Sequence, residues 1–261
     1  MSVLRIFYRS LLLTSVVISG SLMTLLVQRG MVPPGSLQAG FTSWWHRRVA
    51  DALGVRVHVS GTPNPQGTLF IGNHVSWFDI AAIGGSVPVH FLSKAEVRRW
   101  PLLGWLATRA GTLYIKRGGR SAASEAIEAM ASVLNRNHHV LLFAEGTTTD
   151  GRVQKFHSRL VQSAIDAGCD IQPVAIRYPR PYLRGPGASG GEATGETHPA
   201  VLFTDDTGFA ESALAVMSAR GITAEVAFLE PVASAGRSRD ELAAIAENAI
   251  RCYIESASRT R

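Results

Sequence analysis

The sequence predicts an α/β fold with a mostly parallel or mixed central sheet flanked by helices, preceded by a membrane-associated helical pair. Two short apolar runs, at residues 69–71 and 140–143, have the length of buried strands, and turn residues follow each. A much longer apolar run without charge lies near the N-terminus. The chain has 261 residues, of which 46% are hydrophobic, so it can form one large core. We therefore expect membrane-associated helices at 1–53 and a single α/β domain at 54–261.

The N-terminal apolar run covers residues 10–27, which is close to the shortest helix that can cross a bilayer. Arginines flank it on both sides, at Arg9 and Arg29, so charge gives little indication of its orientation. The next segment, 41–53, mixes tryptophans with arginines and a histidine, which is typical of a helix in the headgroup region. We expect a membrane-embedded helical hairpin, with a single crossing as the alternative.

The rest of the chain alternates between strand-like and helix-like patterns. Alternating or short apolar runs predict strands at 54–60, 89–93, 111–115, 171–176 and 223–228, besides the two named above. Helical spacing of apolar residues predicts helices at 102–110, 121–134, 156–167, within 205–220, and at 239–257. The Gly-rich segment 184–199 predicts a loop. Its two matches to glycine motifs carry no prediction, because no helix follows them.

Charge and cysteine content narrow the class of partner. The formal net charge of +6 suits anionic lipid headgroups or phosphorylated molecules. The sequence contains no zinc-ligand spacing, RNA-binding strand motif or helix-turn-helix pattern, so we expect no nucleic-acid partner. Cys169 and Cys252 form no CxxC motif, which fits a reducing compartment. The adjacent pair His138 and His139 cannot share one helix face, and we predict no metal site there.

The segment 68–79 places a histidine and an acid where they can form a pair. His74 follows the strand 69–71 and a Gly-Asn turn, and Asp79 comes five positions later. On a regular helix, five positions rotate the side chain by about 140°, so the two would diverge. They can meet if His74 lies in the turn and Asp79 in the first turn of the next helix. Asp79 would then orient the imidazole and leave its other nitrogen free as a base.

Three further blocks follow this Asn-His-x-x-x-x-Asp segment in order. The block 94–117 carries spaced Lys, Pro, Gly and Arg residues, Glu-Gly-Thr stands at 145–147, and the strand 171–178 contains a Pro-Val step. Each block alone is unspecific, but the ordered set resembles the glycerolipid acyltransferase family that includes the 1-acylglycerol-3-phosphate acyltransferases. The resemblance extends from residue 68 to about residue 231 and makes 54–261 the expected catalytic domain.

The resemblance implies an O-acyltransferase that moves a fatty acyl group from acyl-CoA or acyl-ACP to the hydroxyl of lysophosphatidic acid, giving phosphatidic acid for phospholipid biosynthesis. His74 would act as the general base and Asp79 would stabilise the resulting imidazolium. No bound cofactor and no metal are implied. The matching motif positions are assigned to substrate binding: Asn73, Lys94, Arg117, Glu145, Gly146 and Thr147. Expected partners are membrane lipids, a lyso-lipid acceptor and the acyl carrier, at the cytosolic face of the inner (cytoplasmic) membrane.

Two positions depart from the family pattern. Ala144 stands where relatives usually have Pro, and Thr148 stands where they usually have Arg after Gly-Thr. Because that Arg would help to hold a substrate phosphate, an acceptor without phosphate, such as a lyso-ornithine lipid, is an alternative. Lys155, His157 and Arg159 could supply part of the missing charge. A non-catalytic lipid-binding or membrane-tethering protein is the alternative of a different class, and a hydrolase that uses the same base on water is a third.

Overall fold

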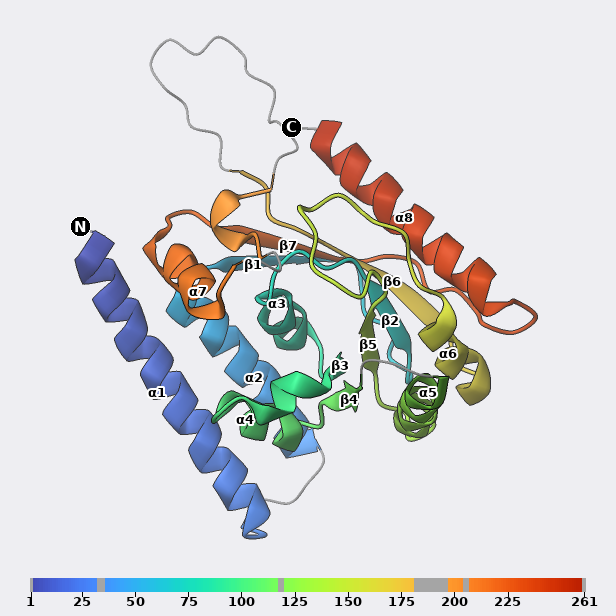
Figure 1. Ribbon diagram of the computed structural model, residues 1–261, viewed down its shortest axis with the longest axis horizontal. Coiled ribbons are helices and arrows are strands. Elements are labelled where there is room, and N and C mark those ends of the chain that lie inside the picture. The colour runs from blue at the N-terminus through green and yellow to red at the C-terminus, as the bar shows by residue number, and fades with distance from the viewer. Residues whose placement is uncertain (1, 32–35, 117–119, 181–196, 204–206, 260–261) are drawn as a thin grey trace.

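A mixed seven-stranded sheet forms the centre of the computed structural model, in the order β1-β7-β6-β2-β5-β3-β4 (Figure 1). The structure describes residues 2–31, 36–116, 120–180, 197–203 and 207–259. The strands are β1 (Arg56–Ser60), β2 (Leu69–Gly72), β3 (His90–Lys94), β4 (Leu113–Ile115), β5 (Val140–Phe143), β6 (Ile171–Arg177) and β7 (Thr223–Phe228). Only the β6–β7 pairing is antiparallel among those of the described strands. The predicted mixed α/β architecture is confirmed.

Helices cover both faces of this sheet (Figure 1). They are α3 (Asp79–Ser86), α4 (Leu103–Arg109), α5 (Arg120–Leu134), α6 (Gln162–Ala167), α7 (Phe209–Ser218) and α8 (Arg239–Arg259). Side chains alternate between the faces along β2: Phe70 packs in the core beneath α3, while Leu69 and Ile71 pack in the core beneath α5 and α8. The predicted helix at 156–167 begins later, with a 3₁₀ turn at Arg159–Val161 before α6. The Gly-rich motif matches lie at 185–191, outside the described residues.

The N-terminal pair consists of α1 (Ser2–Gln28) and α2 (Ser36–Leu53), and Figure 1 shows it along one side of the domain. Within α1, the segment Val3–Gln28 is long enough to cross a membrane and contains an 18-residue window with a mean hydropathy of 2.0. Close packing joins the two helices, because Trp45 Nε1 donates to the Val16 carbonyl at 2.8 Å. A Cβ at Gly20 would lie 2.5 Å from that nitrogen, so only glycine allows this approach. The predicted helical pair is present.

The second half of α2 belongs to the core of the α/β domain. Val49, Ala50 and Leu53 are buried in the same cluster as Phe70 of β2. On the opposite side of α2, Trp44 is 39% exposed, and the headgroup-facing surface stays a prediction. The division between residues 53 and 54 stays a prediction, but the packing shows that the N-terminal segment completes the core of the C-terminal one.

Candidate active site

Parallel pairing brings the predicted site residues to one edge of the sheet. β2 and β5 are neighbours, with Gly72 opposite Phe143. His74 and Glu145, which each lie two positions beyond those residues, therefore emerge at the same carboxyl edge. In open α/β sheets this edge is where ligands bind. Lys94, the last residue of β3, ends at the same edge because β3 pairs with β5 in parallel.

His74 and Asp79 form a hydrogen-bonded pair in the turn between β2 and α3. His74 Nδ1 and Asp79 Oδ2 are 2.8 Å apart, and Asp79 is the first residue of α3. The same carboxylate oxygen accepts from the backbone N–H groups of Val75 and Ser76, at 2.8 and 3.0 Å. The five-residue spacing therefore lets His74 and Asp79 meet, as predicted. Because a carboxylate only accepts, Nδ1 carries the hydrogen and Nε2 presents its lone pair.

Tyr178 completes the environment of Asp79 and was missed from the sequence. Its hydroxyl donates to Asp79 Oδ1 at 2.5 Å, and both side chains are almost completely buried. Burial, the nearby Asp79 charge and this hydrogen bond together raise the pKa of Tyr178. The phenol thus stays protonated and holds the carboxylate in place. No local motif marks Tyr178; it comes near Asp79 because β6 lies next to β2.

The imidazole of His74 is also held across its face. It stacks on the Phe143 ring with centroids 3.9 Å apart and planes inclined by 9°. The backbone around it is fixed as well, since Thr149 N donates to the His74 carbonyl at 2.8 Å. Only 18% of the His74 side chain is exposed. The ring is therefore oriented before any substrate binds, with its Nε2 edge available for proton transfer.

Glu145 holds the histidine turn through its two carboxylate oxygens. Its Oε2 accepts from the backbone N–H of His74 at 2.6 Å, and its Oε1 accepts from Gln154 N at 2.8 Å. The side chain is buried, and this burial raises its pKa to about 7, against the opposing effect of the two N–H donors. Each oxygen keeps a second lone pair, so the substrate-binding role of Glu145 stays a prediction beside this positioning role.

Asn73 likewise bonds to the protein itself. Its side-chain amide donates to the Ile176 carbonyl and accepts from the Ile176 N–H, both at 2.9 Å. The side chain is fully buried. This pair of bonds ties the turn before His74 to β6 and replaces the ladder bonds that β2 no longer makes there. These contacts give Asn73 a role in positioning the turn, and its substrate contact stays a prediction.

The other predicted binding residues lie around a large cavity. Lys94, Gly146 and Thr147 line it, and Gly146 has a φ of 74°, which favours glycine there. Arg117 lies outside the described residues. At Thr148, where relatives usually have Arg, the hydroxyl donates to the Phe203 carbonyl. His157 and Arg159 also line the cavity, so two of the three residues expected to compensate the charge reach it.

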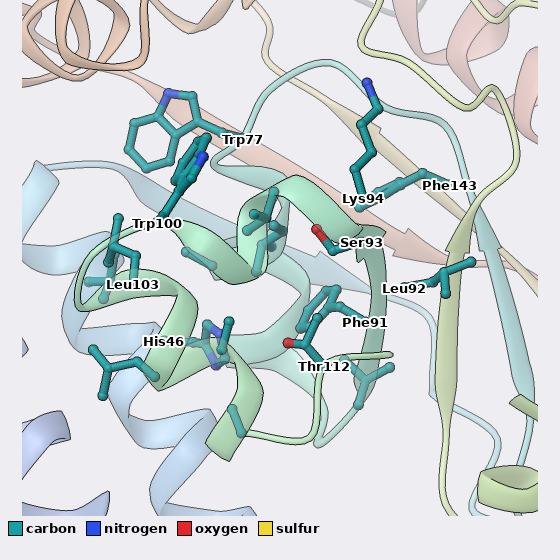
Figure 2. Close-up of a pocket in the computed structure, with 18 of the residues that line it drawn as sticks. His46, Trp77, Phe91, Leu92, Ser93, Lys94, Trp100, Leu103, Thr112 and Phe143 are labelled. Carbon is teal, nitrogen blue, oxygen red and sulfur yellow. The ribbon is translucent and has the colours of Figure 1, made fainter. Parts of the chain in front are cut away.

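The cavity has a volume of about 1700 Å³ and extends from His74 to the helical pair. Its walls come from α1, α2, α4 and β3, and most of its lining side chains are apolar. Figure 2 shows Lys94 and Phe143 on one side, with Phe91 and His46 below them. Trp77 and Trp100 both pack against Phe209, with ring centroids 5.0 and 5.4 Å apart. An oriented base thus opens onto a space suited to hydrocarbon.

Comparisons with known proteins agree with this arrangement. Residues 55–177 match the family model described as Acyltransferase. The chain is 40% identical over 260 residues to lyso-ornithine lipid O-acyltransferase from Pseudomonas aeruginosa, covering 97% of this chain and 95% of that one. It is 38% identical over 127 residues to 1-acyl-sn-glycerol-3-phosphate acyltransferase from Neisseria gonorrhoeae, covering 48% of this chain and 50% of that one.

The fold matches a solved structure as well. The crystal structure of the 1-acyl-sn-glycerophosphate (LPA) acyltransferase PlsC from Thermotoga maritima aligns with a TM-score of 0.69 and 22% identity. The alignment covers 98% of this chain and 95% of that one, including the helical pair. The chain therefore belongs to the acyltransferase family that its four ordered motifs predict, and it is an O-acyltransferase.

Proposed function

We propose that this enzyme transfers a fatty acyl group from acyl-CoA or acyl-ACP to the hydroxyl of a lyso-ornithine lipid. The observation that supports this acceptor is the 40% identity with a lyso-ornithine lipid O-acyltransferase along nearly the whole chain. That similarity includes the helices that line the cavity. The similarity to the 1-acyl-sn-glycerol-3-phosphate acyltransferase from Neisseria gonorrhoeae covers only about half of the chain.

The residue at position 148 supports the same acceptor. A guanidinium there could form charge-assisted bonds to a phosphate, whereas Thr148 is neutral and its hydroxyl donates to Phe203. An ornithine headgroup carries no phosphate, so this cation is dispensable. Lysophosphatidic acid, the acceptor first implied by the motifs, is the second candidate. Lys94 and Arg159 favour it, because both still place positive charge at the cavity.

In the proposed reaction, His74 Nε2 takes the proton from the acceptor hydroxyl while Asp79 stabilises the imidazolium. The acceptor oxygen attacks the thioester carbonyl, forming a C–O bond, and the C–S bond then breaks. The imidazolium returns its proton to the leaving thiolate, so the base is regenerated. The apolar cavity beside His74 would hold the acyl chain, since burying each methylene contributes about 0.8 kcal/mol.

The location follows from the same proposal. The outward side chains of α1 include exposed Phe7, Leu11 and Ile18, which suit contact with lipid. Arg9 fastens that helix to the domain by donating to the Met217 and Ala219 carbonyls at the end of α7. We place the enzyme at the inner (cytoplasmic) membrane with its catalytic domain on the cytosolic side, where acyl-CoA and acyl-ACP are available.

The test compares acceptors with one acyl donor. Purified full-length enzyme in mixed micelles receives lyso-ornithine lipid or lysophosphatidic acid, and kcat/KM is measured for each. We expect lyso-ornithine lipid to be preferred by about tenfold or more, the value of one charged hydrogen bond. A preference for lysophosphatidic acid would overturn the proposed acceptor. A His74→Ala variant that keeps both reactions would overturn the mechanism.

A substitution at position 148 sharpens this test. Thr148→Arg restores the cation of the family pattern, and we expect it to raise kcat/KM for lysophosphatidic acid by about tenfold. Thr148→Gln is the matched control, because it also removes the hydroxyl bonded to Phe203 but adds no charge. An equal gain in both variants would show that the bond to Phe203, not the charge, sets acceptor preference.

A further inference from the structure

The cavity wall contains a buried histidine that the proposed reaction does not use. His46 lies on α2, lines the cavity, and is 7% exposed (Figure 2). Its ring makes aromatic contacts with Trp45 and Phe91, with centroids 5.3 and 6.0 Å away. A polar side chain is costly in such a wall unless both ring nitrogens have partners.

One nitrogen of His46 is accounted for. Nδ1 lies 2.9 Å from the Thr42 carbonyl, and because a carbonyl only accepts, Nδ1 carries the hydrogen. Burial lowers the pKa of His46 to about 4, against the opposing effect of this bond. The ring is therefore neutral at pH 7, and its second nitrogen, Nε2, must be a hydrogen-bond acceptor.

The His46 ring lies flat against α3, and its Nδ1 is turned to its own helix. A Cβ built at Gly84 would lie 2.9 Å from Nδ1, 3.0 Å from Cγ and 3.1 Å from Cε1 of His46, so the face of the ring packs on the Gly84 backbone. Nδ1 points to the Thr42 carbonyl, and Nε2 lies on the side of the ring away from that bond. Among the residues that the structure describes, Nε2 has no hydrogen-bond partner. The surrounding protein atoms do not enclose it completely. It faces the cavity.

The position of His46 sets where along a bound chain it would act. Phe91, which its ring contacts, lies three residues before Lys94 on β3. A strand rises about 3.3 Å per residue, so Phe91 lies roughly 10 Å below the edge that carries His74, with the His46 ring beside it. An acyl chain whose carbonyl is at His74 would bring carbons from its middle past His46.

We propose that His46 Nε2 accepts a hydrogen bond from a hydroxyl near the middle of a fatty acyl chain, which makes the enzyme selective for hydroxylated chains. The hydroxyl is the donor that such a chain can carry at this depth. The inference rests on the proposed function in one respect, namely that an acyl chain occupies the cavity. Either the donor chain or the chain already on the acceptor could bring this hydroxyl, and the experiment separates these sources.

The experiment measures ratios between matched substrates. In one arm, full-length enzyme receives an equimolar mixture of three acyl-CoA donors of equal length: unsubstituted, hydroxylated beside the thioester, and hydroxylated near mid-chain. In the other arm, the donor is unsubstituted and the acceptors differ only by a mid-chain hydroxyl. We expect wild-type enzyme to favour the mid-chain hydroxyl about tenfold in one arm, the discrimination expected from one buried hydrogen bond.

His46→Phe tests the assignment, because it keeps an aromatic ring but removes the acceptor nitrogen. We expect it to abolish the ratio. Phe91→Leu is the control that alters the cavity at the same depth and should keep the ratio. Equal use of all substrates by wild-type enzyme overturns the inference even if His46→Phe does not fold, and so does a ratio that persists in folded His46→Phe. Failure of the proposed acceptor would appear separately, as turnover with lysophosphatidic acid but not lyso-ornithine lipid.

Discussion

Polar side chains differ in their hydrogen bonding between two regions: the turn that carries His74 and the cavity wall formed by α1 and α2. In the turn, the buried polar side chains bind one another or the backbone: Asp79 alone accepts from His74, Tyr178 and two backbone N–H groups. In the wall, apolar side chains dominate, and His46 keeps one nitrogen toward the cavity. The turn thus holds one geometry, whereas the wall leaves a polar atom without a partner among the described residues.

The largest effect is expected where the turn meets substrate. His74→Ala removes the base, and loss of a general base typically lowers rate about 10² to 10⁴-fold. We expect kcat to fall by that factor while circular dichroism and melting temperature show a folded protein. His58→Ala, at an exposed position on β1, is the matched control and should retain wild-type kcat. Near-normal turnover in folded His74→Ala would show that His74 is not the general base.

The next effect tests whether the wall is part of the domain core. Leu53 is fully buried at the end of α2, and truncating such a leucine typically costs about 2–5 kcal/mol. We expect Leu53→Ala to lower the free energy of unfolding by that amount in urea titrations in detergent. Leu11→Ala, on the exposed side of α1, should change it little. Equal values for the two variants would show that α2 is an appendage.

A pH dependence should distinguish the polar turn from the wall. The pKa of Glu145 is raised to about 7 in the folded protein from an ordinary value of 4.5. The folded state therefore binds this proton more tightly, so the contribution of Glu145 to stability is fully present below pH 4.5 and is lost as pH rises through 7. Between low and high pH, the contribution of Glu145 to the free energy of unfolding changes by an amount on the order of 3 kcal/mol. The free energy of unfolding, measured from about pH 4 to about pH 8, should lose this pH-dependent part in Glu145→Gln. An unchanged slope against pH in that variant would contradict the assignment to Glu145.

The smallest effect is expected from the edge of the turn network. Tyr178→Phe removes one donor to buried Asp79, and one such bond corresponds to about a tenfold loss of kcat. The carboxylate becomes more basic and favours the His74 imidazolium, so the acid limb of kcat/KM should move to higher pH. Tyr253→Phe on α8 is the control. A loss of stability without a shift of this limb would make Tyr178 purely structural.

Local sequence was sufficient for the elements and for the central pair. Apolar runs identified β2 and β5 because a buried strand needs apolar side chains on both faces. The five-residue spacing identified His74 and Asp79 because a turn followed by a first helical turn lets them meet. The acyltransferase family could be predicted for the same reason, since its motifs lie within short segments at strand ends.

The contacts that hold this pair depended on which strands became neighbours. Tyr178 and Asn73 act through β6, about a hundred residues further along the chain, and Glu145 acts through β5. No local pattern specifies that both strands flank β2, because strand order results from packing of the whole sheet. The same holds for His46: its segment looked interfacial in sequence, but close packing against Gly84 buried its ring in the cavity wall.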